Sequence, residues 1–342
     1  MEDLVYFYPS GHAAHFENGH PERPERVEAI RNALQARDWW DAYPQLPPLE
    51  LSQSVLQAIH SPQHLQAVQF ASLHAEHFDL DTYTTPSSWS LALNAAGGAA
   101  AVAAQVWRRE ARRGYALTRP PGHHATRDQS MGFCLLNNVA LAAEWLLQQA
   151  GAARLAIVDL DLHHGNGSQD IFWERGDVLY ISTHQSPLYP GTGALQETGA
   201  GPGAGANANF PLPPGAGDRA FQRVMDELIL PLLERFEPQM LLVSVGYDTH
   251  WRDPLGSLQL SALGYSRLVT KLAAFADDQC QGRIALFLEG GYDLEAGAAC
   301  GEGNVAALLD QPWRDPLGSA PGPESDSWER MVLLAQQIWG LK

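Results

Sequence analysis

Five short segments of almost continuous apolar residues divide the chain, each bounded by polar or turn-forming residues. Such segments are typical of parallel strands that helices cover on both faces of the sheet. The predicted strands are Tyr115–Thr118, Leu155–Val158, Val178–Ser182, Met240–Val245 and Ile284–Leu288. Their alternation with longer segments of helical periodicity predicts an α/β domain.

Between these segments the apolar residues recur with helical spacing. In the first of them Val27, Ile30 and Leu34 are three and four positions apart, which places them on one face of a helix. The predicted helices are Pro24–Arg37, Leu91–Arg108, Asn138–Gln149, Asp218–Phe236 and Ala262–Asp277.

The last part of the chain changes in composition. Residues 311–327 are rich in proline, glycine and aspartate, which predicts an exposed linker. Residues 328–340 carry an apolar stripe that includes Val332 and Trp339, so we expect a C-terminal helix that docks on the core. The pattern as a whole predicts a single domain over residues 1–342.

Composition narrows the class of protein. Hydrophobic residues make up 45% of the chain and charged residues 18%, which excludes an intrinsically disordered protein. No apolar run approaches the roughly 20 residues of a membrane span, and the first residues lack the pattern of a signal peptide, so we expect a cytoplasmic protein. A net charge of −17 disfavours nucleic acids and anionic membranes as partners and leaves the oligomeric state open.

Every predicted strand runs directly into titratable or metal-binding residues. Since side chains two positions apart on a strand point the same way, Asp161 and His163 can hold one ion together, with Asp248 approaching from another strand end. Three protein ligands leave one position open, as in catalytic zinc sites. Zinc is the leading metal, while two carboxylates also suit Fe(II), Co(II) or Mn(II).

Two carboxylates largely cancel the charge of the metal, so attack on an unreactive carbonyl calls for a separate base and a second electrophile. His123 and His124 are adjacent imidazoles after the rigid Pro120–Pro121 turn, and either can move a proton. Tyr292 follows two glycines and can offer its hydroxyl to a developing oxyanion.

At this point the sequence resembles a known family, the zinc-dependent histone deacetylases and their class II-like bacterial relatives, the histone deacetylase-like amidohydrolases and acetylpolyamine amidohydrolases. The motifs that carry the resemblance are Arg119–Ala125, Gly132–Asn138, Asp159–Gly167, Tyr189–Gly193, Gly246–Asp248, Asp253–Gly256 and Leu288–Tyr292. The resemblance implies the arginase–deacetylase fold, a single domain with an eight-stranded parallel sheet flanked by helices. It also implies that one Zn²⁺ binds to Asp161, His163 and Asp248.

The same resemblance implies a role for each catalytic residue. His124 is the general base that activates the metal-bound water, and His123 assists it electrostatically. Tyr292 polarises the substrate carbonyl. Asp159 stands behind His123, and Asn166, an amide where many relatives carry aspartate, stands behind His124.

Substrate-binding and structural ion sites are implied in the same way. Gly132 and Phe133 match the wall of the acyl-lysine tunnel, Asp81 the aspartate at its rim, and Leu255 the position of a gatekeeper. Two structural K⁺ sites are expected. The first comprises Asp159, Asp161, His163, Ser182 and Thr183, and the second comprises Phe172, Arg175 and Val178.

The gatekeeper position bears on the substrate. A glutamate there marks class II-type polyamine deacetylases, whereas Leu255 cannot attract a second ammonium group, which favours acyl-lysine in proteins or peptides. Acetylpolyamine remains the alternative substrate, with an acidic gate elsewhere, such as Glu76 or Asp79. A non-catalytic module that binds acylated ligands and an arginase-like enzyme with two Mn(II) ions are more distant alternatives.

Overall fold

The computed structural model describes residues 1–341 and contains a single seven-stranded sheet in which every neighbouring pair of strands is parallel. The strand order is β1-β2-β7-β6-β3-β4-β5. The strands are β1 (Glu2–Phe7), β2 (Ala111–Ala116), β3 (Leu155–Asp159), β4 (Val178–Gln185), β5 (Asn207–Leu212), β6 (Leu241–Val245) and β7 (Ile284–Leu288).

The expected count of eight strands is wrong for the described residues, and the edge beside β1 shows why. There the chain makes a single parallel bridge, in which the amide of Tyr6 donates to the carbonyl of Pro44 and the amide of Leu46 donates to that of Tyr6. Proline lacks the amide hydrogen that a strand needs, and Pro44, Pro47 and Pro48 surround this bridge. The segment therefore cannot extend into an eighth strand.

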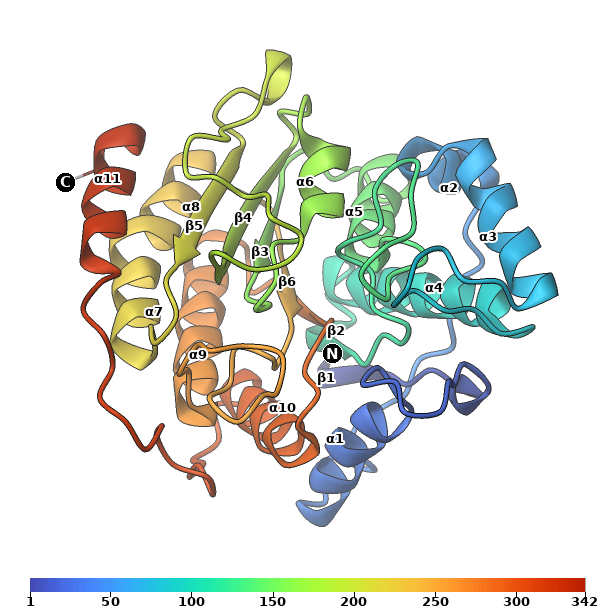
Figure 1. The fold of residues 1–342 in the computed structure, drawn as a ribbon, viewed down its shortest axis with the longest axis horizontal. Coiled ribbons are helices and arrows are strands. Elements are labelled where there is room, and N and C mark those ends of the chain that lie inside the picture. The colour runs from blue at the N-terminus through green and yellow to red at the C-terminus, as the bar shows by residue number, and fades with distance from the viewer. Residues whose placement is uncertain (342) are drawn as a thin grey trace.

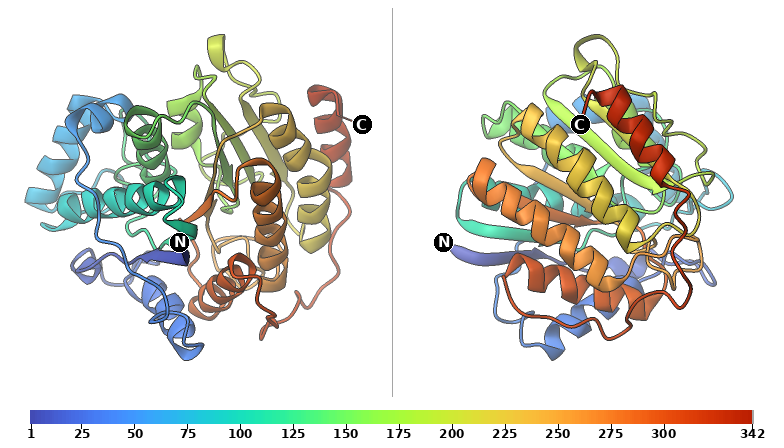
Figure 2. Two further views of the ribbon diagram at one scale, coloured as in Figure 1. Left: turned by 180° about the vertical axis from the view of Figure 1, so that it is seen from behind. Right: turned by 90° about the vertical axis from the view of Figure 1, so that its left-hand side faces the viewer.

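Helices cover both faces of the sheet, as Figures 1 and 2 show. One face is covered by α2 (Gln53–Ile59), α3 (Pro62–His74), α4 (Ser88–Trp107), α5 (Asn138–Gln149) and α6 (Asn166–Phe172). The other is covered by α1 (Glu25–Ala36), α7 (Asp218–Val224), α8 (Leu230–Phe236), α9 (Ala262–Gln279), α10 (Leu294–Leu308) and α11 (Glu329–Trp339). Alternate residues of a strand pack against the two helical layers. In β3, for example, Ile157 belongs to the core on the first face and Val158 to the core on the second.

The predicted strands correspond to β2, β3, β4, β6 and β7, although β2 begins and ends earlier than expected. The chain after Ala116 already belongs to the loop that carries the two histidines. The sequence did not reveal β5, which pairs with β4 alone and therefore forms an edge of the sheet. Polar Asn207 and Asn209 and the proline at 211 hide its strand character, and an edge strand tolerates a proline.

The helix predicted over Asp218–Phe236 is interrupted. A π-helical turn at Met225–Ile229 separates α7 from α8, and Pro231 lies in the first turn of α8. A proline inside a continuous α-helix would lose one backbone hydrogen bond and clash with the preceding turn. The wider π-helical turn before Pro231 accommodates both the missing hydrogen bond and the steric clash.

The segment after α10 runs over the surface and ends in α11, which packs on β5 and α7 (Figure 2). The residues of the segment between α10 and α11 are mostly exposed. Even so, the carboxylate of Glu324 accepts hydrogen bonds from the backbone amides of Arg219 and Ala220 at the start of α7 (2.9 and 2.8 Å). Buried Val332 and Trp339 face the core. None of the helices within residues 1–341 combines the length and hydropathy of a membrane span.

Candidate functional site

The loops that leave the carboxyl ends of four adjacent strands, β2, β7, β6 and β3, converge on one place. The loop after β2 brings His123, β3 and its loop bring Asp159 and His163, the loop after β6 brings Asp248, and the loop after β7 brings Tyr292. Neighbouring parallel strands end at the same edge of a sheet, so residues far apart in sequence meet there. Each of these residues is at most 9% exposed.

Asp161, His163 and Asp248 form one compact group, in which one potential ligand atom from each lies within 4.8 Å of the others. The Nδ1 atom of His163 is 3.3 Å from Asp161 Oδ1 and 3.2 Å from Asp248 Oδ2. The two carboxylates are further fixed by backbone amides, since Gly290 donates to Asp161 Oδ2 (2.8 Å) and Leu162 to Asp248 Oδ1 (3.0 Å). The group is therefore preorganised.

The electrostatics of this group favour a cation. Burial alone would lower the pKa of His163, but hydrogen bonds to Asp161 and Asp248 raise it to about 10. Burial and the neighbouring charge of Asp161 raise the pKa of Asp248. Two buried carboxylates thus require a positive charge between them, and a divalent ion held by one imidazole and two carboxylates would supply it.

Backbone next to the group lies too close for any side chain. A Cβ atom on Gly246 would collide with the carboxylate of Asp161, and one on Gly290 would collide with that of Asp248. Both positions require glycine because the two loops approach the carboxylates directly.

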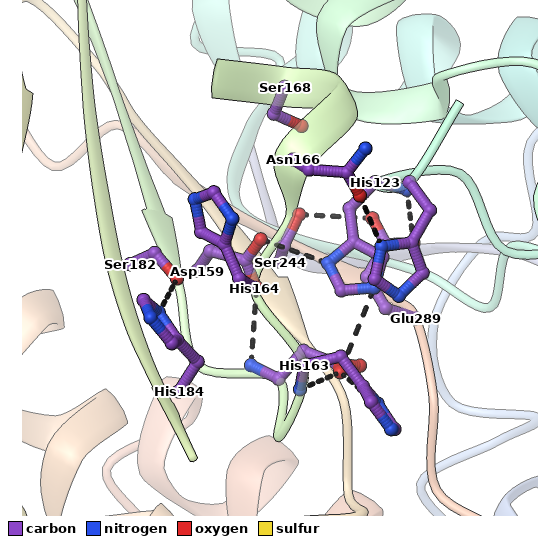
Figure 3. Close-up of polar contacts among 12 residues, drawn as sticks. His123, Asp159, His163, His164, Asn166, Ser168, Ser182, His184, Ser244 and Glu289 are labelled. Atoms are coloured by element: carbon purple, nitrogen blue, oxygen red, sulfur yellow. Dashed lines mark hydrogen bonds and ion pairs between the residues drawn. The ribbon is translucent and has the colours of Figure 1, made fainter. Parts of the chain in front are cut away.

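The two adjacent histidines have different partners, and Figure 3 shows His123 close to Asp159. His123 Nδ1 is 3.0 Å from Asp159 Oδ2, which also accepts a hydrogen bond from the hydroxyl of Tyr180. His124 Nδ1 is 2.7 Å from the side-chain oxygen of Asn166. Since an amide oxygen only accepts, Nδ1 of His124 carries the hydrogen and its Nε2 is free to take a proton.

These partners shift the pKa values of the two imidazoles in opposite directions. Burial would lower the pKa of His123, but the charges of Asp161 and Asp159 raise it well above its usual value. Burial and the neighbouring imidazoles of His123 and His163 lower the pKa of His124. One ring is therefore held as a cation and the other neutral, a division typical of an electrostatic partner and a base.

Tyr292 lines the same cavity as the two histidines. Its backbone amide donates to Asp253 Oδ2 (2.6 Å), its ring packs edge-on against Phe133, and the guanidinium of Arg26 lies 4.8 Å from its ring centre. Burial raises the pKa of the phenol well above its usual value, so the hydroxyl stays protonated and can donate a hydrogen bond.

A buried charge cluster that we did not predict from the sequence holds the tyrosine loop. From α1, Arg26 donates to the backbone carbonyl oxygens of Glu289 and Gly291 and to the carboxylate of Glu22 (3.1 Å). Arg119 donates to both carboxylate oxygens of Glu22 (2.8 and 3.0 Å). The sequence carries one signal for this cluster, the repeated Pro-Glu-Arg at residues 21–26. Charged residues that lie beside prolines and just before the apolar face of a helix can point into the core.

Removing the charge of Glu22 should strongly destabilise the fold. Burial would raise its pKa, but Arg119 and Arg26 lower it to about 2. We expect Glu22→Gln to lower the free energy of unfolding by about 3–5 kcal/mol at pH 7, measured by urea denaturation, because two guanidinium groups lose their counter-charge. The difference should shrink as the pH falls below about 4.5, the usual pKa of Glu, towards about 2, since wild type loses this stabilisation on protonation.

Glu17 provides a matched control for this prediction. It forms an ion pair with His77 in which both side chains are about 40% exposed. Glu17→Gln should change the free energy of unfolding by less than about 1 kcal/mol. Equal effects of the two substitutions would contradict the assignment of Glu22 as the centre of a buried cluster.

A second buried carboxyl group also escaped the sequence analysis as a site residue. Glu289 Oε2 accepts the backbone amides of Gly122 (2.7 Å) and His123 (3.1 Å), and its Oε1 accepts the hydroxyl of Ser244 (3.0 Å). Glu289 directly follows β7 and holds the histidine loop that follows β2 against the sheet (Figure 3). Burial raises its pKa to about 7 although the charge of His123 opposes this.

A cavity of about 550 Å³ leads from the surface to the two adjacent histidines, to His163 and to Tyr292. It contains all four predicted substrate-binding residues, namely Gly132, Phe133, Asp81 and Leu255. Gly132 and Phe133 both have positive φ angles (55° and 69°), and a Cβ atom on Gly132 would collide with the His124 ring. Tyr189 lines the cavity with its ring edge-on to His124 at 5.3 Å, a contact that the motif alone did not reveal.

The first of the two expected potassium sets shares Asp159, Asp161 and His163 with the site. Asp159 and Ser182 face each other in the β3–β4 register, and the hydroxyl of Thr183 donates to the carbonyl of Asp159 (3.3 Å). The second set occupies the turn between α6 and β4, where the amide of Arg175 donates to the carbonyl of Phe172 and Val178 opens the strand. K⁺ binding at either place remains a prediction.

Comparison with known proteins agrees with this geometry. The profile of the histone deacetylase domain matches residues 20–308. A probable deacetylase of Archaeoglobus fulgidus is 41% identical over 278 residues, which cover 81% of this chain and 77% of the archaeal protein. A histone deacetylase-like amidohydrolase of Pseudomonas aeruginosa is 34% identical, with 87% of this chain and 80% of that protein covered.

Among solved structures, the HD domain of HDA15 superposes with a TM-score of 0.90 at 34% identity, covering 99% of this chain and 95% of that one. The resemblance seen in the motifs is thereby confirmed. This chain belongs to the histone deacetylase family of hydrolases.

Proposed function

We propose that this protein hydrolyses the amide bond of Nε-acyl-lysine in proteins or peptides and that it uses one Zn²⁺ ion. One observation carries the proposal. A preorganised cation site, the neutral imidazole of His124 and the protonated phenol of Tyr292 lie together at the inner end of one cavity. Amide hydrolysis needs a polarised carbonyl, a base for water and a donor for the oxyanion.

The ligand set fits zinc. Asp161, His163 and Asp248 supply two oxygen ligands and one nitrogen ligand, and three protein ligands leave a position open for chemistry. When bound, the ion would act as a Lewis acid towards the carbonyl oxygen and would make water a better nucleophile.

The residues of the chain take the remaining roles in this proposal. His124 removes a proton from the attacking water through Nε2 and returns it to the departing amine. His123, held as a cation by Asp161 and Asp159, stabilises the negative charge that develops nearby. Tyr292 donates a hydrogen bond to the oxygen of the tetrahedral intermediate.

The cavity favours a linear aliphatic chain ending in an amide. Phe133 and Leu255 contribute apolar walls, and Leu255 gives the polyamine alternative no counter-charge at that position. One observation keeps acetylpolyamine as a second candidate, because the carboxylates of Asp79 and Asp81 also line the mouth and could attract a distal ammonium group.

Chelation and substrate comparison test the proposal together. The purified protein should contain about one zinc per chain by elemental analysis, and removal of the ion should abolish cleavage of an acetyl-lysine peptide until Zn²⁺ is added back. The kcat/KM for that peptide should exceed that for acetylputrescine. The reverse order would favour the polyamine alternative, whereas full activity without metal would rule out the proposed chemistry.

A further inference from the structure

Leu80 is 96% exposed, and it lies at the mouth of the cavity described above. A single exposed leucine is ordinary on a protein surface, whereas a contiguous apolar patch beside a binding cavity marks a contact that forms on binding. Its surroundings decide whether this leucine is an incidental surface residue or part of a recognition site.

The loop that presents Leu80 is firmly braced. The carboxylate of Asp79 accepts the backbone amides of Asp81 (2.9 Å) and Thr82 (2.6 Å), which closes a tight turn around Leu80. The turn is tied to the N-terminal segment by His20, whose Nε2 donates to the backbone carbonyl of Asp81 (3.0 Å). A side chain on such a rigid support loses little conformational entropy when a ligand covers it.

The rest of the mouth has the same apolar character. Leu188, Leu255 and Tyr189 line the same cavity, and each remains partly or largely exposed. Asp79 is occupied in the turn, whereas no side-chain hydrogen bond or ion pair within the described residues engages the carboxylate of Asp81. The mouth therefore offers apolar contact surface with one free carboxylate beside it.

We propose that Leu80 forms a specificity subsite for an apolar side chain next to the acyl-lysine of a peptide substrate. The inference rests on the proposed function, in which the acyl group reaches the histidines while the peptide backbone stays at the mouth. The side chain adjacent to the acyl-lysine then lies at the level of Leu80. A polyamine has no such side chain and gains nothing from this contact.

The test uses two pairs of acetyl-lysine peptides that differ only in leucine or glycine, placed before the acetyl-lysine in one pair and after it in the other. We expect wild type to prefer the leucine peptide of one pair by about tenfold in kcat/KM, mainly through KM. Leu80→Ala should reduce this preference to about twofold and leave the glycine peptides and acetylputrescine unaffected. Leu73→Ala is the matched control, since Leu73 is 72% exposed on α3 and outside the cavity, and it should retain the full preference.

The outcomes separate the subsite from the proposed function. Peptide cleavage without any preference for leucine, or a preference that Leu80→Ala leaves intact, overturns the subsite alone. An equal loss on acetylputrescine would also overturn it, since that substrate has no side chain to lose. Cleavage of acetylputrescine with no turnover of any peptide overturns the proposed acyl-lysine specificity and the subsite with it.

Discussion

Replacing Tyr292 with phenylalanine is expected to lower kcat on an acetyl-lysine peptide by about 10²–10³-fold. The substitution removes one hydroxyl that donates to the developing oxyanion, and the loss of a single donor of this kind has effects of that size. The ring should stay in place, because Arg26 and Phe133 contact it and the backbone amide of Tyr292 remains bonded to Asp253. Steady-state kinetics measure the effect.

Metal content separates a chemical role from a structural one. Tyr292→Phe should retain about one zinc per chain and the thermal stability of wild type, since none of the ligand atoms belongs to the tyrosine. Tyr43→Phe, a partly buried tyrosine that packs against Tyr6 away from the cavity, serves as control and should keep wild-type kinetics. Wild-type turnover in Tyr292→Phe would refute the assigned role.

The second large effect is expected for His124→Ala, with a loss of about 10²–10⁴ in kcat, the range for removal of a general acid–base group. The imidazole is neutral because burial and its two histidine neighbours lower its pKa, and Asn166 orients it. The alanine leaves a space within the cavity that free imidazole can enter. Added imidazole should therefore restore part of the rate, and a purely structural histidine would not respond in this way.

His74→Ala is the control for that experiment. His74 is exposed at the end of α3, and among residues 1–341 its ring makes one hydrogen bond, to the backbone carbonyl of Phe70. The variant should show wild-type rates with and without imidazole. Unchanged kinetics in His124→Ala would remove this residue from the mechanism.

The grouping of Asp161, His163 and Asp248 could be predicted because it depends on two simple properties of the chain. Side chains alternate along a strand, and parallel strands end at a common edge, so local sequence places these residues together. The strand at Ile284–Leu288 and the helix at Asn138–Gln149 were predicted with their observed bounds for a similar reason. Their signals, a continuous apolar run and a helical periodicity, are local.

Features that depend on contacts distant in sequence could not be predicted. Arg119 and Glu22 are 97 positions apart, and neither sequence position shows that both side chains are fully buried. In β5 the buried polar groups bond to another element, since Asn207 and Asn209 both donate to Gln169, so the strand lacks an apolar signature. The expected count of eight strands was wrong because the prolines near residue 44 prevent strand pairing where that segment meets the edge of the sheet, and the sequence does not show that contact.

The cluster around Arg119 also sets a practical limit on where the protein can be cut. The family profile begins at residue 20, but Arg119 donates to the backbone carbonyl oxygens of His12 and His15, both at 2.6 Å. A recombinant fragment that starts at the profile boundary would leave a fully buried guanidinium without two of its acceptors. The first nineteen residues are thus an integral part of the folding unit, and domain-based cloning should retain them.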